Sequence, residues 1–205
     1  HTSATNLDPH MLNIELSRSV KSTVEVPVTL VGSVETPEEA EAAIAEGACD
    51  MVALARALAA DPQWPAKARD GRAGEIVPCL RCLQCYHIST DRWNVGCSVN
   101  PRFANETFVP CRVEPASVKK KVLVVGAGPA GVMAAATAHA RGHEVVLAER
   151  DETVGGAVRL IAREHHKEDA ARYLRYMRHE VEELARLPRF ELRLGLEVSP
   201  KTVRE

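Results

Sequence analysis

Four cysteines in the middle of the chain have a spacing that suits a metal centre. Two residues separate Cys79 from Cys82 and Cys82 from Cys85, and eleven residues separate Cys85 from Cys97. Thiolates this close can converge on one centre, and the overlapping Cys-x-x-Cys pairs favour a [4Fe–4S] cluster. A structural zinc site is the alternative, although zinc usually takes its cysteines from two well-separated pairs.

A glycine-rich motif further along the chain is typical of dinucleotide binding. Gly126, Gly128 and Gly131 match the pattern G-x-G-x-x-G, between a predicted strand and a predicted helix. The first glycine allows a tight turn, the second lets backbone approach a pyrophosphate, and the third lets helix and strand pack closely. Glu149 falls 23 residues after Gly126, where an acidic side chain can bind the ribose hydroxyls of an adenosine.

A second pair of glycines follows at Gly155 and Gly156. A second approach of backbone to the same pyrophosphate would explain the pair, and a simple loop is the alternative. The spacing alone does not decide between them.

The elements that must position the first half of the chain alternate between strand and helix. The apolar run 26–32 predicts a short buried strand, and 50–55 predicts a second one. Between them, Thr36 and Glu39 form a predicted capping box that opens a helix ending near residue 47. This unit implies parallel pairing of the two strands. A further helix is expected over 61–70.

The rest of the chain divides into a poorly periodic segment and a second alternating region. Residues 74–118 hold most of the cysteines and several prolines, so a metal would be needed to order them. After a linker, the sequence predicts strands and helices in alternation, closing with a strand that could form a sheet edge. These predicted elements are strand 121–126, helix 129–141, strand 144–149, amphipathic helix 170–187 and strand 190–196. Residues 1–20 are polar and are expected to be irregular.

Composition excludes several classes of function. The 205 residues are 45% hydrophobic and 26% charged with a net charge of −2, which gives no sign of a nucleic-acid or membrane partner. The longest uncharged run, 122–140, is interrupted by glycines and a proline, so a membrane helix is not expected. Six cysteines without an export signal favour a reducing compartment, which we take to be the cytoplasm. Cys49 and Cys111 are interpreted there as free thiols.

The order of these motifs resembles a family of iron–sulfur flavoenzymes related to bacterial 2,4-dienoyl-CoA reductase and trimethylamine dehydrogenase. In that family an FMN-binding barrel of the Old Yellow Enzyme type precedes a four-cysteine segment and an FAD- or ADP-binding domain. The resemblance is carried by VPVTLVG and GACDMVALARALAADPQWPAKARDGR for the last barrel strands, CLRCLQC…GCSVNP for the cluster, and VVGAGPAG…LAERDETVGG for the dinucleotide fingerprint.

The resemblance implies an α/β chain of three parts. Residues 1–73 would be the C-terminal portion of a TIM barrel, 74–118 the iron–sulfur segment and linker, and 119–205 an incomplete Rossmann-like domain for FAD or ADP. A full barrel needs roughly 200–250 residues, so the chain is expected to be a fragment that is inactive by itself.

Site residues follow from the same resemblance. The FMN phosphate would meet Gly32, Ser33, Ala55 and Arg56, in the loops after the last two barrel strands. The implied dinucleotide contacts are Gly126, Gly128, Gly131, Glu149, Arg150, Gly155 and Gly156, and the implied cluster ligands are Cys79, Cys82, Cys85 and Cys97. No catalytic residue is assigned. His1 is too near the start of the sequence to judge, and His10, His165 and His166 are expected to lie at the surface.

Two departures bear on the assignment of substrate. The family usually has Gly-Arg-Pro in the last phosphate loop, where this chain has Ala55-Arg56-Ala57. The first cysteine spacings are nearer those of the amine dehydrogenases, and the spacing to the fourth cysteine is nearer that of the reductases.

The resemblance implies a redox flavoenzyme that acts on a small molecule and is compatible with a homo-oligomer. NAD(P)H would feed FAD, and electrons would pass through the cluster to FMN, which reduces an activated C=C bond. Two alternatives remain open. One is an amine dehydrogenase of the trimethylamine dehydrogenase type, with electrons leaving to a carrier protein. The other is a non-enzymatic, zinc-stabilised nucleotide-binding module.

Overall fold

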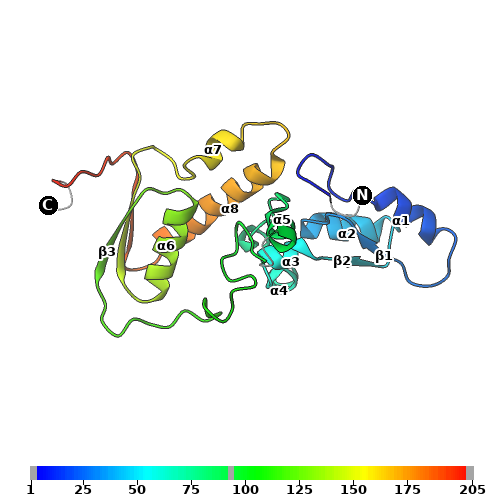
Figure 1. The fold of residues 1–205 in the computed structure, drawn as a ribbon, viewed down its shortest axis with the longest axis horizontal. Coiled ribbons are helices and arrows are strands. Elements are labelled where there is room, and N and C mark those ends of the chain that lie inside the picture. Colours follow the sequence, from blue (N-terminus) through cyan, green and yellow to red (C-terminus); the bar gives the residue numbers. More distant parts are fainter. Residues whose placement is uncertain (1–3, 92–94, 202–205) are drawn as a thin grey trace. The chain divides into compact units, whose positions relative to one another are not determined.

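A computed structural model describes residues 4–91 and 95–201. The chain forms two compact units, shown in sequence colours in Figure 1. Unit 1 consists of His1–Val109 together with His166–Asp169, and unit 2 consists of Pro110–His165 together with Ala170–Glu205.

The centre of unit 1 is a parallel pair of short strands. β1 (Thr29–Val31) pairs with β2 (Met51–Ala53), and α2 (Pro37–Ala45) lies between them in the sequence. The register places Leu30 opposite Val52. These elements confirm the predicted strand–helix–strand unit. The capping box is also confirmed, because the Thr36 hydroxyl accepts from the Glu39 N–H while the Glu39 carboxylate accepts from the Thr36 N–H.

The start of the chain is more ordered than its composition predicts. Within the stretch expected to be irregular, α1 (Ile14–Lys21) forms a helix. The hydroxyl of Ser17, buried on this helix, donates to the carbonyl of Ala48 at 2.8 Å. The helix is supported by a contact with a residue far away in the sequence, and such a contact leaves no local sequence pattern. The polar composition of residues 1–20 therefore does not indicate the helix.

The region after β2 contains the helix predicted over 61–70, together with a short helix before it that was not predicted. α3 (Arg56–Ala60) ends at Asp61, which is extended, and α4 (Trp64–Arg69) begins three residues later with a proline in its first turn. The carboxylate of Asp61 accepts from the N–H of Gln63 and from the ammonium of Lys67, so its side chain competes with helical pairing at the break. A 3₁₀ turn, η1 (Ala73–Glu75), and α5 (Gln84–Asp91) follow. The helix α5 lies in the segment predicted to lack periodicity.

The core of unit 1 is small and mostly aliphatic. It consists of Leu30, Val34, Ala40, Ala43, Cys49, Ala57, Trp64 and Ile76. The indole N–H of Trp64 donates to the carbonyl of Glu35, so this large side chain is buried with its polar atom paired.

Unit 2 is a three-stranded parallel sheet with helices between its strands. β3 (Lys121–Val125), β4 (Glu144–Ala148) and β5 (Phe190–Arg193) lie in that order across the sheet, with β5 at an edge as predicted. Figure 1 shows α6 (Pro129–Ala140) against this sheet, followed in the sequence by α7 (Val158–Ile161) and α8 (Glu168–Ala185). The predicted apolar stripe of α8 is buried, namely Leu174, Met177, Val181 and Leu184.

No helix among the described residues is long and apolar enough to cross a membrane.

Candidate functional site

The loops after β1 and β2 lie together at one end of the strand pair. Gly32 and Ser33 follow β1 and both have positive φ, at 138° and 55°. The φ of Gly32 favours glycine, and a Cβ there would also press on the side chain of Asn13, 2.8 Å from its nitrogen. Arg56, which opens α3 after β2, donates from Nη2 to the Ser33 hydroxyl at 3.1 Å. The two predicted phosphate loops are therefore joined by a side-chain contact.

A cavity of about 570 Å³ opens beside these loops. Gly32, Ser33, Ala55 and Arg56, the four residues predicted to meet an FMN phosphate, all line it. Arg56 also has a buried Nη1 atom with no hydrogen-bond partner among the described residues. A buried cationic donor without a partner is costly, and an anion in the cavity would satisfy it. These residues fit a phosphate group.

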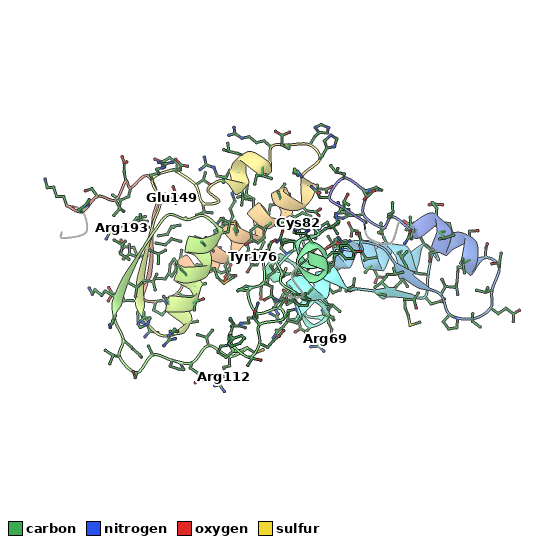
Figure 2. All side chains as sticks on the ribbon, viewed as in Figure 1. Arg69, Cys82, Arg112, Glu149, Tyr176 and Arg193 are labelled. Atoms are coloured by element: carbon green, nitrogen blue, oxygen red, sulfur yellow. The ribbon has the colours of Figure 1, made fainter. Side chains whose placement is uncertain are left out.

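The four predicted ligand cysteines line a second, smaller cavity in unit 1. Cys79 is buried, Cys85 and Cys97 are half-buried, and Cys82 is exposed. Figure 2 shows Cys82 in the stretch that precedes α5. The structure thus brings all four residues of the motif around one space, including Cys97, which follows α5 in the sequence.

The environment of two of these thiols, Cys79 and Cys97, opposes ionisation in the absence of a metal. Burial, with the nearby charge of Glu35, raises the pKa of Cys79 to about 12, and burial also raises the pKa of Cys97. A thiolate is the form that ligates iron or zinc, so metal binding here would release protons.

Among the residues described, no three His, Cys, Asp or Glu side chains are arranged to hold a metal ion. The cysteine motif therefore gathers around one cavity without forming a finished single-ion site. The iron–sulfur assignment stays a prediction.

The two cavities of unit 1 share part of their lining. Arg56, Ala59, Leu83 and Cys85 border both spaces. Groups bound in the two cavities would be separated by little more than these side chains.

The glycine motif of unit 2 has the geometry that its pattern predicts. Gly126 has a φ of 96°, and Gly128 caps the N-terminus of α6. A Cβ on Gly131 would lie 1.8 Å from the carbonyl oxygen of Gly126, so the close approach of helix and loop requires glycine. The turn and its packing match the features that bring a pyrophosphate to a helix N-terminus.

The second glycine pair packs on the first motif. The N–H of Gly155 donates to the carbonyl of Ala127 at 2.8 Å, and a Cβ on Gly156 would lie 3.2 Å from the Cα of Gly128. Both glycines have positive φ. The pair therefore packs on the first glycine loop, and its approach to the pyrophosphate stays a prediction.

Glu149 lies at the end of β4, beside the glycine loop (Figure 2). Its carboxylate accepts from the N–H of Ala127 at 2.7 Å and from the N–H of Asp151 at 3.0 Å, and the residue is 7% exposed. Glu149 therefore holds the first loop in place. Each carboxylate oxygen of Glu149 retains a further lone pair that could accept from a ribose hydroxyl. The predicted role of Glu149 toward a ribose stays a prediction. Arg150 is exposed next to it.

His10 does not lie at the surface, and that prediction is wrong. Its Nδ1 atom contacts the carboxylate of Glu39, its Nε2 atom lies 3.0 Å from Asp169, and its side chain is 12% exposed. Asp169 also accepts from Arg81, which lies between Cys79 and Cys82 in the cysteine motif. Sequence reasoning missed Arg81 and Asp169 because 88 residues separate them. His165 and His166 are exposed as predicted, and His1 lies outside the described residues.

Comparison with known proteins places the two halves of the chain in flavin enzymes. Residues 4–75 match the family model described as NADH:flavin oxidoreductase / NADH oxidase family, and residues 121–188 match the model of the FAD dependent oxidoreductases. The chain is 44% identical over 149 residues to the NADH oxidase of Thermoanaerobacter brockii, covering 72% of this chain and 23% of that protein.

Two solved structures show the same fold over nearly the whole chain. A 2-naphthoyl-CoA reductase in complex with 2-naphthoyl-CoA has a TM-score of 0.89 and 33% identity, covering 98% of this chain and 30% of that chain. A histamine dehydrogenase from Rhizobium sp. 4-9 has a TM-score of 0.85 and 25% identity, covering 98% of this chain and 29% of that chain.

The matches over residues 4–75 and 121–188 assign these two segments to the class of flavin oxidoreductases. Within that class, the chain belongs to the flavin oxidoreductases that include the NADH oxidases, 2-naphthoyl-CoA reductase and the related amine dehydrogenases. It spans less than a third of the length of these relatives.

Proposed function

We propose that the chain is part of an NAD(P)H-dependent flavin oxidoreductase of the ene-reductase type. FMN would lie in the larger cavity of unit 1, a [4Fe–4S] cluster at the four cysteines, and FAD or ADP at the glycine loops of unit 2. When bound, these groups would carry electrons from NAD(P)H through FAD and the cluster to FMN, for the reduction of an activated C=C bond. The residues proposed to hold each group are those predicted from the sequence.

The observation that carries this proposal is the shared lining of the two cavities in unit 1. Arg56 lines both cavities and has an unpaired, buried guanidinium nitrogen, and Cys85 also borders both cavities. An anionic cofactor held by Arg56 would therefore lie next to a metal centre held by the cysteines. Such proximity is useful only if electrons pass between the two groups.

The remaining parts of the proposal follow from this arrangement. Residues 1–73 would contribute the last part of a TIM barrel, 74–118 the cluster segment, and 119–205 the dinucleotide domain. The substrate would be a small molecule, and the protein would work in the cytoplasm, where its thiols stay reduced.

A second candidate function is amine oxidation, with electrons leaving through the cluster to a carrier protein. The specific observation in its favour is the similarity to histamine dehydrogenase over 98% of the chain. The spacing of the first three cysteines also resembles that of the amine dehydrogenases.

The test is anaerobic purification of the protein that carries this sequence, followed by analysis for iron, acid-labile sulfide, zinc, FMN and FAD. Rapid mixing with NADH, NADPH or a primary or tertiary amine, with the flavin absorbance recorded, then shows which donor reduces the protein. We expect iron with sulfide, reduction by a nicotinamide, and reoxidation by an activated alkene. Reduction by the amine alone would favour the second candidate. Zinc without iron or sulfide would leave only a zinc-stabilised nucleotide-binding module.

A further inference from the structure

A chain of buried and half-buried charged groups runs through unit 1 to the cysteine loop. Nε of Arg81 donates to Oδ2 of Asp169 at 2.8 Å, and Oδ1 of Asp169 pairs with Nε2 of His10 at 3.0 Å. The other ring nitrogen of His10 contacts Glu39. Asp169 belongs to unit 1 together with residues 166–168, so the whole chain of contacts lies within one unit.

Arg81 is held on several sides. The residue is 4% exposed, and its Nη1 atom donates to the backbone carbonyl of Asp8 at 2.7 Å and more weakly to that of Pro9. Within the cysteine loop, its own N–H donates to Sγ of Cys79 at 3.3 Å. The side chain and the backbone of one residue thus connect a buried ion pair to a predicted cluster ligand.

The backbone of this loop needs such support. Arg81 has a φ of 46°, in the left-handed region, and Leu83 follows with a φ of 57°. Residues other than glycine are strained in this conformation, because Cβ comes too close to the backbone, so it persists only where neighbouring contacts impose it. The ion pair to Asp169 is the strongest such contact described for Arg81.

We propose that Asp169, supported by His10, is a positioning residue for the cysteine loop, acting through Arg81. The inference rests on the proposed function, because the loop is taken to hold the cluster. Asp169 fixes the guanidinium of Arg81, the guanidinium fixes the left-handed backbone between Cys79 and Cys82, and that backbone sets where the two thiolates lie.

The same contacts have an electrostatic consequence that a merely structural role lacks. Reduction adds one electron to a cluster, so a positive charge nearby favours the reduced form. Arg81 stands between Cys79 and Cys82 in the sequence and carries such a charge, and its ion pair with Asp169 offsets that charge. Removing the charge of Asp169 should therefore raise the reduction potential of the cluster, and removing the charge of Arg81 should lower it.

The experiment compares the intact protein with the variants Asp169→Asn and Arg81→Gln, both purified without air. Amide hydrogen exchange of residues 79–85 reports the loop, release of iron to a chelator reports retention of the cluster, and a redox titration followed by electron paramagnetic resonance gives the potential. The titration is done at pH 6, so that His10 keeps its proton beside Glu39. Ser17→Ala is the matched control, because it removes a buried hydrogen bond of unit 1, from Ser17 to Ala48.

We expect both variants to exchange the loop amides at least tenfold faster and to lose iron several-fold faster, with potentials displaced in opposite directions. Ser17→Ala should change neither loop exchange nor potential. Loop exchange and potential in Asp169→Asn equal to those of the unsubstituted protein would overturn the proposal, as would shifts matched by Ser17→Ala. If the unsubstituted protein contains no iron and sulfide, the proposed function fails, and loop exchange alone decides whether Asp169 positions the loop.

Discussion

Nη2 of Arg56 and the hydroxyl of Ser33 lie 3.1 Å apart, so one hydrogen bond joins the loops that follow the two parallel strands of unit 1. The other terminal nitrogen of Arg56 is buried and unpaired among the described residues. The guanidinium is therefore fixed by one hydrogen bond while a second donor remains available for a ligand. This relationship makes Arg56 the sharpest test of the proposed FMN site.

Replacement of Arg56 by Gln should weaken FMN binding by about 10- to 100-fold, because a charge-assisted contact to a phosphate is worth roughly 1.5–3 kcal/mol. Flavin fluorescence during titration of the apoprotein measures the dissociation constant. The control is Arg69→Gln, since the Arg69 side chain is 76% exposed and pairs only with its neighbour Asp70 in the described contacts. Equal affinities in the two variants would remove Arg56 from the site.

Replacement of Cys82 by Ala should abolish the cluster and disorder the segment 74–118, because three thiolates hold a four-iron cluster poorly and the segment has little core of its own. Iron and sulfide analysis with visible absorbance measures the loss. Cys111→Ala is the matched control, since Cys111 is an exposed free thiol in the linker. Unchanged iron in Cys82→Ala would refute the assignment of this ligand.

Replacement of Gly131 by Ala should destabilise unit 2 by several kcal/mol, since the added methyl group would lie 1.8 Å from the carbonyl oxygen of Gly126. Gly128→Ala provides the contrast. No atom lies within 4 Å of a Cβ built there, so this variant should fold normally and lose affinity for the dinucleotide. Thermal unfolding and nucleotide titration of both variants separate the two effects. Normal stability of Gly131→Ala would contradict the packing described.

Replacement of Glu149 by Ala should both weaken nucleotide binding and lower stability by about 1–3 kcal/mol, because the N–H groups of Ala127 and Asp151 lose their acceptor. Glu149→Gln keeps an acceptor oxygen and should recover part of the stability. Calorimetric titration with ADP, together with urea unfolding, measures both quantities. If Glu149→Ala binds ADP as tightly as the original protein, the residue serves the loop alone.

The stability of unit 1 should depend on pH through His10. Burial lowers the pKa of His10, but its hydrogen bonds and charge contacts with Asp169 and Glu39 outweigh burial and raise the pKa from 6.5 to about 9. Because the pKa of His10 is higher in the folded state than in the unfolded state, protonated His10 stabilises the fold fully below the unfolded pKa. This contribution to stability is lost as the pH rises from about 6.5 to 9. We expect the free energy of unfolding to fall by about 1–2 kcal/mol across this window. This is less than the full pKa shift would give, because the site is partly solvated.

The carboxylates of the same network act at the other end of the pH scale. Burial would raise the pKa values of Asp169 and Glu39, but the contacts with His10, and with Arg81 for Asp169, lower them below 3.8 and 4.5. Their contribution is present above those values and is lost as the pH falls further. Urea unfolding from about pH 3 to 10 should therefore show a plateau between about pH 5 and 6.5. His10→Gln should flatten the alkaline side and also weaken the acid side, because His10 helps to lower the pKa values of both carboxyl groups. An alkaline slope that survives in His10→Gln would assign the effect to another group.

Features that depend on neighbours in sequence were predictable. The capping box of Thr36 and Glu39, the buried stripe of α8 and the close packing at Gly131 all follow from residues within one or two turns of each other. Such patterns are local, because helix caps and helix faces repeat over three or four residues. The glycine motif and the four cysteines can therefore be located from the order of residues alone.

Tertiary structure decided the features that join distant residues. His10 has the sequence surroundings of a surface histidine, yet it lies beside Asp169, 159 residues away, and α1 is stabilised by a contact of Ser17 with Ala48. The break between α3 and α4 at Asp61 also depends on packing, since the carboxylate of Asp61 accepts from the N–H of Val77 beyond α4. No periodicity in the chain encodes such contacts, because each depends on how separate elements come to lie against one another. The sequence by itself thus determined which residues are predicted to bind iron, phosphate and dinucleotide, and only the tertiary structure decided which charged groups contact Arg81 in the cysteine loop.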